Sequence, residues 1–228
     1  MRAPFSVHEA LVQKFRRLDP LTREAVKDTA LDALYNAMVK ARGHAETMAK
    51  LPDEIMADRI YSRETNAEKL RREVSKLAAQ AGQWLDDAVT QAGAALEHVR
   101  LDIAEPPAPE ANSNEADYEE EIRTTFRGLS NKERQTAFAE ALRREDIMTI
   151  GAVLRLGLPS LVVGMSETER ELRRREWQTK HYPAELDRID RLGKGMEAGG
   201  RARRALDTFA RQLVSEAVAL ELDRAAGA

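Results

Sequence analysis

The sequence has no cysteine, few aromatic residues and no long apolar run. Without cysteine, disulfides, thiolate metal sites and a cysteine nucleophile are excluded. Aromatic residues make up only 5% of the chain. No segment approaches the roughly 18 consecutive apolar residues of a membrane helix, and the first 20 residues lack the apolar core of a signal peptide. We therefore expect no membrane partner and a cytoplasmic location.

The sequence is instead rich in charge and in residues that favour helices. Charged residues make up 33% and apolar residues 43% of the 228 positions. Alanine, leucine, glutamate and arginine dominate, which favours α-helix. The net charge of −3 is unevenly distributed, because residues 105–121 carry seven acidic side chains and no basic one, whereas residues 122–228 carry 20 basic and 16 acidic ones. We predict an all-α protein with an acidic middle segment and a mildly basic C-terminal part.

The chain is expected to have three parts. Residues 1–104 are predicted to form a helical hairpin that resembles a coiled coil. Residues 118–228 are predicted to form a C-terminal helical domain with a long final helix. Between them, residues 105–117 (EPPAPEANSNEAD) are predicted to be an acidic linker, because the three prolines in this segment oppose helix formation.

Proline also marks the expected limits of the first long helix. Asp19-Pro20 has the form of an N-cap followed by proline in the first helical turn, so a helix is predicted from there to about Lys50. Leu51-Pro52 is predicted to break the helix, because an interior proline removes a backbone hydrogen bond and clashes with the preceding turn.

The clearest helical pattern is an apolar stripe between residues 70 and 103, in which the apolar positions are three or four residues apart. We favour an antiparallel hairpin within one molecule, because short connections between neighbouring helices are the usual case. The alternative is a seam for another subunit. In either case the stripe is predicted to pack against a helix, and its proposed interaction residues are Leu70, Val74, Leu77, Leu85, Val89, Leu96 and Val99.

The most continuously apolar stretch is GLPSLVVGMS, residues 157–166. It contains Pro159 and two glycines, and it ends at Ser166, which together with Glu169 has the spacing of a capping box. We interpret the stretch as a buried turn between helices that itself contains one helical turn. Ser160 lacks the Gly-x-Ser-x-Gly surroundings of a nucleophile elbow, so no nucleophile is expected there.

The spacing of the histidines and glycines was compared with that of metal sites and phosphate-binding loops. The four histidines do not have the spacing that places two metal ligands on one helical face. The glycines at 193, 195, 199 and 200 follow a predicted helix rather than a strand, which favours a bend or a close helix crossing over a phosphate loop. We predict no catalytic residue, no metal site and no cofactor, and hence a protein that is not an enzyme.

Four residues of the next helix are candidates for contacts with phosphate. Arg170, Arg174, Trp177 and His181 fall near one helical face, and the indole is able to stack between the cations. Glutamates interleaved at helical spacing favour a solvated helix that pairs with itself. A second basic run, made of Arg201, Arg203, Arg204 and Arg211, allows the same two interpretations. Nucleic acid is therefore the less favoured partner, and a nucleic-acid-binding accessory factor is the alternative function.

One segment has a recognisable order of features. From Leu142 to Pro183 the run LRREDIMTIGAVLRLGLPSLVVGMSETERELRRREWQTKHYP has an acidic residue, a short helix, an apolar turn with proline, Gly-Met-Ser, a capped charged helix with tryptophan, and a basic-aromatic-proline stop. It resembles small uncharacterised helical proteins from the structural-gene clusters of tailed bacteriophages. The resemblance implies a virion-associated or assembly role and a location in the host cytoplasm and the virion, and it brings no site residues.

Taken together, the apolar stripe and this resemblance lead us to expect a non-enzymatic structural or assembly protein that acts through helix–helix packing. Its expected partners are further copies of itself or other structural proteins of a particle. We also expect the acidic segment to dock on a basic surface of a neighbouring subunit. Neutralising Glu119, Glu120 and Glu121 should then weaken assembly while leaving the fold intact.

Overall fold

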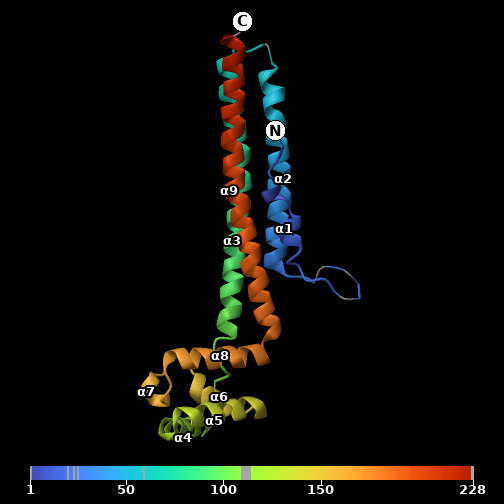
Figure 1. Cartoon of the computed structure of the whole chain (residues 1–228). Coiled ribbons are helices and arrows are strands. Elements are labelled where there is room, and N and C mark those ends of the chain that lie inside the picture. The colour runs from blue at the N-terminus through green and yellow to red at the C-terminus, as the bar shows by residue number, and fades with distance from the viewer. Residues whose placement is uncertain are drawn as a thin grey trace. The chain divides into compact units, whose positions relative to one another are not determined.

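The computed structural model describes residues 2–19, 21, 22, 24, 26–58, 60–108 and 114–226, and within these residues the chain forms helices and no β-strand (Figure 1). This confirms the predicted all-α fold with a long final helix. No helix in the described part of the chain has an apolar stretch long enough to cross a bilayer.

The chain divides into two compact units. Unit 1 comprises Met1–Leu96 together with Asp190–Ala228, and unit 2 comprises Glu97–Ile189. This division differs from the predicted boundaries at residues 104 and 118, because most of the final helix belongs with the N-terminal helices rather than with a C-terminal domain.

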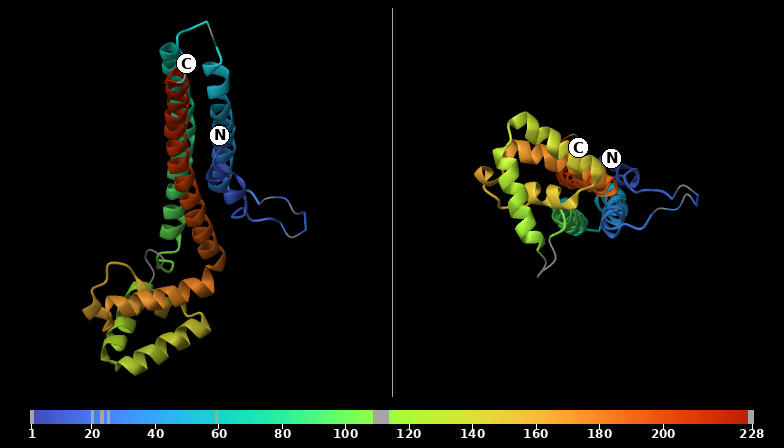
Figure 2. Two further views of the ribbon diagram at one scale, coloured as in Figure 1. Left: turned by 45° about the horizontal axis from the view of Figure 1, so that its top comes forward. Right: turned by 90° about the horizontal axis from the view of Figure 1, so that it is seen from below.

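Unit 1 is built on three long helices, preceded by the short helices η1 (Phe5–Val7) and α1 (Ala10–Gln13). The long helices are α2 (Thr29–Met56), the unit 1 part of α3 (Arg63–Asp102) and the unit 1 part of α9 (Pro183–Ala226). They lie side by side, with α3 antiparallel to the other two (Figures 1 and 2). The predicted hairpin is therefore present as α2 and α3, and α9 adds a third helix to it.

Close approach of these helices depends on small residues. The core of unit 1 contains fully buried Leu34, Leu85 and Leu206 together with many buried alanines. A Cβ placed on Gly199 would lie 2.8 Å from Cγ2 of Val89, a separation that real Cβ atoms essentially never show. The glycine-rich part of α9 therefore makes the predicted close helix crossing, with the helix continuous through it.

The limits of α2 differ from the prediction at both ends. Asp28, not Asp19, caps the helix, and its side chain accepts hydrogen bonds from the backbone N–H groups of Ala30 and Leu31. Asp19 instead accepts from the N–H groups of two residues in its own turn. At the other end the helix continues through Pro52 to Met56, and burial of Ile55 in the core of unit 1 offsets the cost of the interior proline.

Besides the end of α3 and the start of α9, the described residues of unit 2 form five helices around a second core. They are α4 (Glu115–Gly128), α5 (Asn131–Arg144), α6 (Ile147–Leu154), α7 (Ser160–Val163) and α8 (Glu167–His181). Their shared core contains the buried side chains of Phe126, Phe138, Ile150, Leu154 and Trp177.

Capping boxes fix the starts of α5 and α8. Ser130 and Ser166 each accept a hydrogen bond from the N–H of the glutamate three residues on, and that glutamate accepts one from the serine N–H. For Glu169, the backbone N–H and the hydroxyl of Ser166 hold the pKa of the carboxyl below its usual value. The capping box predicted at Ser166 is confirmed.

The GLPSLVVGMS stretch forms the predicted turn between helices, but it is buried only in part, since Gly157, Pro159 and Ser160 are exposed. Residues 160–163 make the single helical turn α7, and Gly164 ends it with a φ of 70°. Val163 and Met165 are buried in the core of unit 2. The apolar character of this stretch therefore serves packing within the unit.

The predicted linker is in part an ordered piece of unit 2. Helix α4 begins at Glu115, inside the range 105–117, and residues 109–113 lie outside the described residues. Pro106 is buried, and its carbonyl accepts a hydrogen bond of 2.8 Å from Nη1 of Arg155. Prolines exclude helix here, as expected, so the carbonyl groups of Pro106 and Pro107 have no helical hydrogen bonds. Arg155 donates to both of them instead.

Candidate functional site

The apolar stripe of α3 is covered within the chain itself. Leu70, Val74, Leu85 and Leu96 are buried in the core of unit 1, and Leu77 and Val89 are half-buried against it. Val99, on the part of α3 that belongs to unit 2, is also buried. These contacts match the hairpin interpretation, because a covered stripe is not available as a seam for another subunit.

The predicted phosphate-contacting face of α8 points into unit 2. Arg170, Arg174 and Trp177 do share a face, but they are only 3%, 6% and 1% exposed, and His181 is half-buried beside Trp177. Leu172, on the outer face, is 55% exposed. The prediction of a nucleic-acid surface at these four residues is therefore corrected, since nucleic acid does not reach side chains inside the unit.

The two buried arginines of α8 are held by groups of their own unit. Arg170 pairs with Glu167, and Nη1 of Arg174 lies 2.6 Å from Oε2 of Glu171. Nη2 of Arg174 also donates to the carbonyl of Leu154 at 3.0 Å. The predicted pairing of glutamates with arginines within the same helix is therefore present. In these two pairs the partners are three residues apart.

Sequence reasoning missed a buried ion cluster in unit 2. Glu119 is 6% exposed and binds two arginines, Arg155 and Arg123, the latter with Nη1 and Oε2 3.1 Å apart. Arg155 also donates to the carbonyls of Pro106 and Pro107. Nothing in the local pattern marks Glu119 among its acidic neighbours, because its partner Arg155 is 36 residues away.

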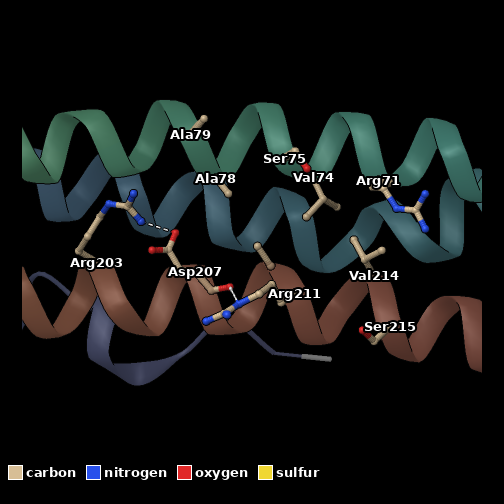
Figure 3. Close-up of a pocket in the computed structure, with 11 residues that line it drawn as sticks. Arg71, Val74, Ser75, Ala78, Ala79, Arg203, Asp207, Arg211, Val214 and Ser215 are labelled. Carbon is tan, nitrogen blue, oxygen red and sulfur yellow. Dashed lines mark hydrogen bonds and ion pairs between the residues drawn. The ribbon is translucent and has the colours of Figure 1, made fainter.

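An open groove lies between α3 and α9 on unit 1 (Figure 3). This α3/α9 groove has a volume of about 780 Å³ and is lined by residues 71–79 of α3 and 203–215 of α9. In Figure 3 helix α2 lies behind both helices, so the groove opens on the side away from α2. The lining part of α9 is roughly 18 Å long, at about 1.5 Å per residue.

The floor of the α3/α9 groove is formed by small apolar side chains. Val74 is 1% exposed, and Ala78 and Ala210 are each 8% exposed. Ala79 and Ser75 beside them are exposed, and Val214 is half-buried. Small side chains on both helices leave space that a row of larger side chains would fill.

Arginines define the electrostatics of the same groove. Arg203 binds Asp207 and Asp86, and its Nε lies 3.1 Å from Oδ2 of Asp86. The hydrogen bond to Asp207 is the main cause that raises the pKa of Arg203. Arg71 pairs with Glu68 outside the groove lining. Arg211 donates to the backbone carbonyl of Asp207, and the described residues give it no carboxylate partner. Because Glu68 pairs with Arg71, and Asp86 and Asp207 pair with Arg203, Arg211 is the cation of the lining that no carboxylate in the described residues neutralises.

The structure brings together no cluster of metal ligands in the residues it describes: no group of three or more histidine, cysteine, aspartate or glutamate side chains converges there. His98 pairs with Asp102, and His44 packs edge-on against Trp84 with ring centroids 4.8 Å apart. We take the α3/α9 groove as the candidate site, because it combines small apolar side chains and arginines along two helices and so suits packing and charge pairing.

Comparison of the chain with protein-family models, with curated proteins and with solved structures finds no match.

Proposed function

We propose that the protein is a non-enzymatic structural or assembly component that acts through helix–helix packing, as a virion-associated part of a tailed-bacteriophage particle. The observation that carries this proposal is the α3/α9 groove. It joins a floor of small apolar side chains to an arginine rim along about three helical turns. A helix laid into such a groove would extend a three-helix arrangement to four, the arrangement of a four-helix bundle.

The architecture of unit 1 supports the same proposal. Its three helices are held by a continuous core from Leu31 to Ala217, so the groove stands on a rigid support rather than on loops. Rigid helices present a packing surface at low cost in conformational entropy. The covered stripe of α3 stabilises the subunit, and the groove lies beside it, with Val74 belonging to both.

The particle context is supported by the resemblance of residues 142–183 to small helical proteins from tailed-phage structural-gene clusters. In this chain that segment builds α6, α7 and α8 of unit 2, with the turn between helices at their centre. We propose that the protein is made in the host cytoplasm and is then incorporated into the virion.

The experiment is to measure the mass of the purified protein by size-exclusion chromatography with light scattering over a range of concentrations. In parallel, purified phage particles from a producing culture are analysed for the protein by mass spectrometry. We expect a mass above that of one 25.6 kDa chain, or the protein in the particles, or both. A monomer at all concentrations that is absent from particles would contradict the proposal.

A matched pair of variants ties the result to the groove. Ala79 and Ala94 are both exposed alanines of α3, but only Ala79 lines the groove. Ala79→Trp fills the groove and should lower association or incorporation into particles by roughly tenfold or more, the effect of losing a well-packed contact of about 1.4 kcal/mol. Ala94→Trp should leave both unchanged, and equal effects of the two variants would point to a different surface.

A further inference from the structure

We propose that the α3/α9 groove binds helix α4 of a second copy of this chain. The inference rests on the proposed assembly function and names the partner of its groove. In this contact the acidic outer face of α4 would lie against the arginines of the groove, and Tyr118 would reach the apolar floor. The argument depends on the outer face of α4, its length, and the charge of the two units.

Helix α4 has a buried inner face and an exposed outer face. Glu119 and Phe126 are buried on its inner face, which packs against the rest of unit 2. Its outer face exposes Asp117, Tyr118 and Glu121. Tyr118 is 52% exposed, and none of these three side chains is needed for the core of unit 2. The outer face is therefore acidic, with one large amphipathic ring.

Lengths agree between the helix and the groove. Helix α4 has 14 residues, which corresponds to roughly 20 Å. The lining part of α9, from Arg203 to Ser215, has roughly the same length, near 18 Å. A tyrosine ring suits a floor of alanine and valine, because it buries a large apolar surface and keeps its hydroxyl at the wet edge.

Charge favours a contact between unit 1 of one copy and unit 2 of another. The residues of unit 1 include 22 basic and 20 acidic side chains, a net charge of +2, and those of unit 2 include 14 basic and 19 acidic ones, a net charge of −5. Opposite charges steer two such surfaces together and penalise like-charged alternatives. At the contact itself, Asp117 and Glu121 of the α4 face would meet Arg211, which has no carboxylate partner among the described residues.

The same charges argue against a symmetric contact between two grooves. A groove-to-groove dimer would place Arg71, Arg203 and Arg211 of one copy against the same arginines of the other. A contact between α4 and the groove uses two different surfaces, so each added copy offers a new groove or a new α4. Such head-to-tail contacts close into rings or continue as filaments.

The first test exchanges charges across the proposed contact. Glu121→Lys and Arg211→Glu should each raise the dissociation constant for self-association by roughly tenfold, because each replaces an attraction by a repulsion. The double variant Glu121→Lys/Arg211→Glu should recover most of the loss if the two residues meet. Sedimentation velocity at several protein concentrations measures the effect, and circular dichroism checks that each variant is folded. Glu54→Lys, at an exposed position on α2, is the control for net charge.

The second test mixes two variants that are defective on different surfaces. Ala79→Trp has a blocked groove and an intact α4, and Glu121→Lys has the reverse. Each alone should be mainly monomeric, and a 1:1 mixture should form heterodimers that do not grow further. A symmetric groove contact gives a different result, because Glu121→Lys would then self-associate normally.

The outcomes separate this inference from the proposed function. Self-association that Glu121→Lys and Arg211→Glu change no more than Glu54→Lys would overturn the α4 contact and leave the assembly function standing. A monomer that is nevertheless found in particles would show that it assembles with a partner other than a second copy, which also overturns the inference. A monomer that is absent from particles would remove both proposals.

Discussion

Arginine–carboxylate pairs inside unit 2 connect single residues to the order of a whole segment. Arg155 binds Glu119 and the carbonyls of Pro106 and Pro107, and the backbone N–H of Leu156 donates to Glu105 at 2.9 Å. Buried charges are tolerated only when they are paired and hydrogen-bonded. The cluster thus holds a proline-rich segment that has no helical hydrogen bonds of its own.

Replacing Glu119 with glutamine should destabilise the protein strongly. Glutamine keeps the shape of the side chain but leaves Arg155 and Arg123, whose side chains are 17% and 12% exposed, without their shared carboxylate. Breaking a buried pair from one side costs about 3 kcal/mol or more. Urea denaturation measures the loss, with Glu121→Gln as the control, because Glu121 is exposed on the same helix. Equal stability of both variants would show that the cluster contributes little.

This result would revise the predicted effect of neutralising Glu119, Glu120 and Glu121 together. The structure separates the three, since Glu119 is buried whereas Glu120 and Glu121 are exposed. A triple variant would therefore mix a folding defect with any assembly defect. The exposed residues alone report on assembly.

Gly164 is a second residue whose replacement has a clear expected result. Its φ of 70° is costly for other residues, and a Cβ there would lie 3.2 Å from Cα of Arg127. Gly164→Ala should cost about 1–3 kcal/mol of the free energy of unfolding. Gly43→Ala is the control, because no neighbouring atom lies within 4 Å of a Cβ at this position in α2, and alanine should stabilise that helix by about 0.5–1 kcal/mol. Thermal denaturation distinguishes the opposite signs.

At the scale of elements, α3 shows how a stripe is divided between core and surface. The apolar positions predicted from spacing are buried or half-buried, and the alanines between them complete the contact surface. Leu85 is fully buried, whereas Leu77 lies at the edge of the core. The spacing identifies the buried face but does not rank the residues on it.

Leu85→Ala should therefore cost more than Leu77→Ala. A fully buried leucine loses transfer energy and leaves a cavity, so Leu85→Ala should cost about 3–5 kcal/mol of the free energy of unfolding. At Leu77 the neighbouring solvent fills part of the space, and the cost should be roughly half as large. Guanidinium denaturation of both variants measures the difference. The reverse order would contradict the assignment of Leu85 to the core.

At the scale of the whole molecule, the described residues form two separate hydrophobic cores. One core belongs to unit 1 and draws on residues from both ends of the sequence, and the other lies within unit 2. Residues 97–189 therefore form a unit inserted between two parts of another. Both ends of the chain must be present before unit 1 can complete its core.

Hydrogen exchange should show the two cores as separate groups. Leu85→Ala should speed exchange at the amides of Leu34 and Leu206 in unit 1, because local opening of that core becomes easier. The amides of Phe138 and Ile150 in unit 2 should keep their protection, since their core is a separate cluster. A matched loss of protection in both groups would show that the chain unfolds as one cooperative unit.

The sequence by itself determined the helical class, the apolar face of α3, the start of α8 at its capping box, and the turn between helices at residues 157–166. These features depend on spacing and on side chains within a few residues of one another. The same spacing identified the face shared by Arg170, Arg174 and Trp177, but local pattern does not distinguish a polar face turned outward from one buried with its counter-charges. The pattern at Asp19-Pro20 predicted a helix start that the structure places at Asp28 instead.

Only the tertiary structure decided which helices join which unit, that Glu119 is buried among exposed acids, and that a groove lies open between α3 and α9. Each of these depends on residues far apart in the chain, such as Glu119 with Arg155 or Arg203 with Asp86. Burial and pairing at such distances follow from how complete helices pack, and that packing is a property of the assembled core rather than of any local stretch of sequence.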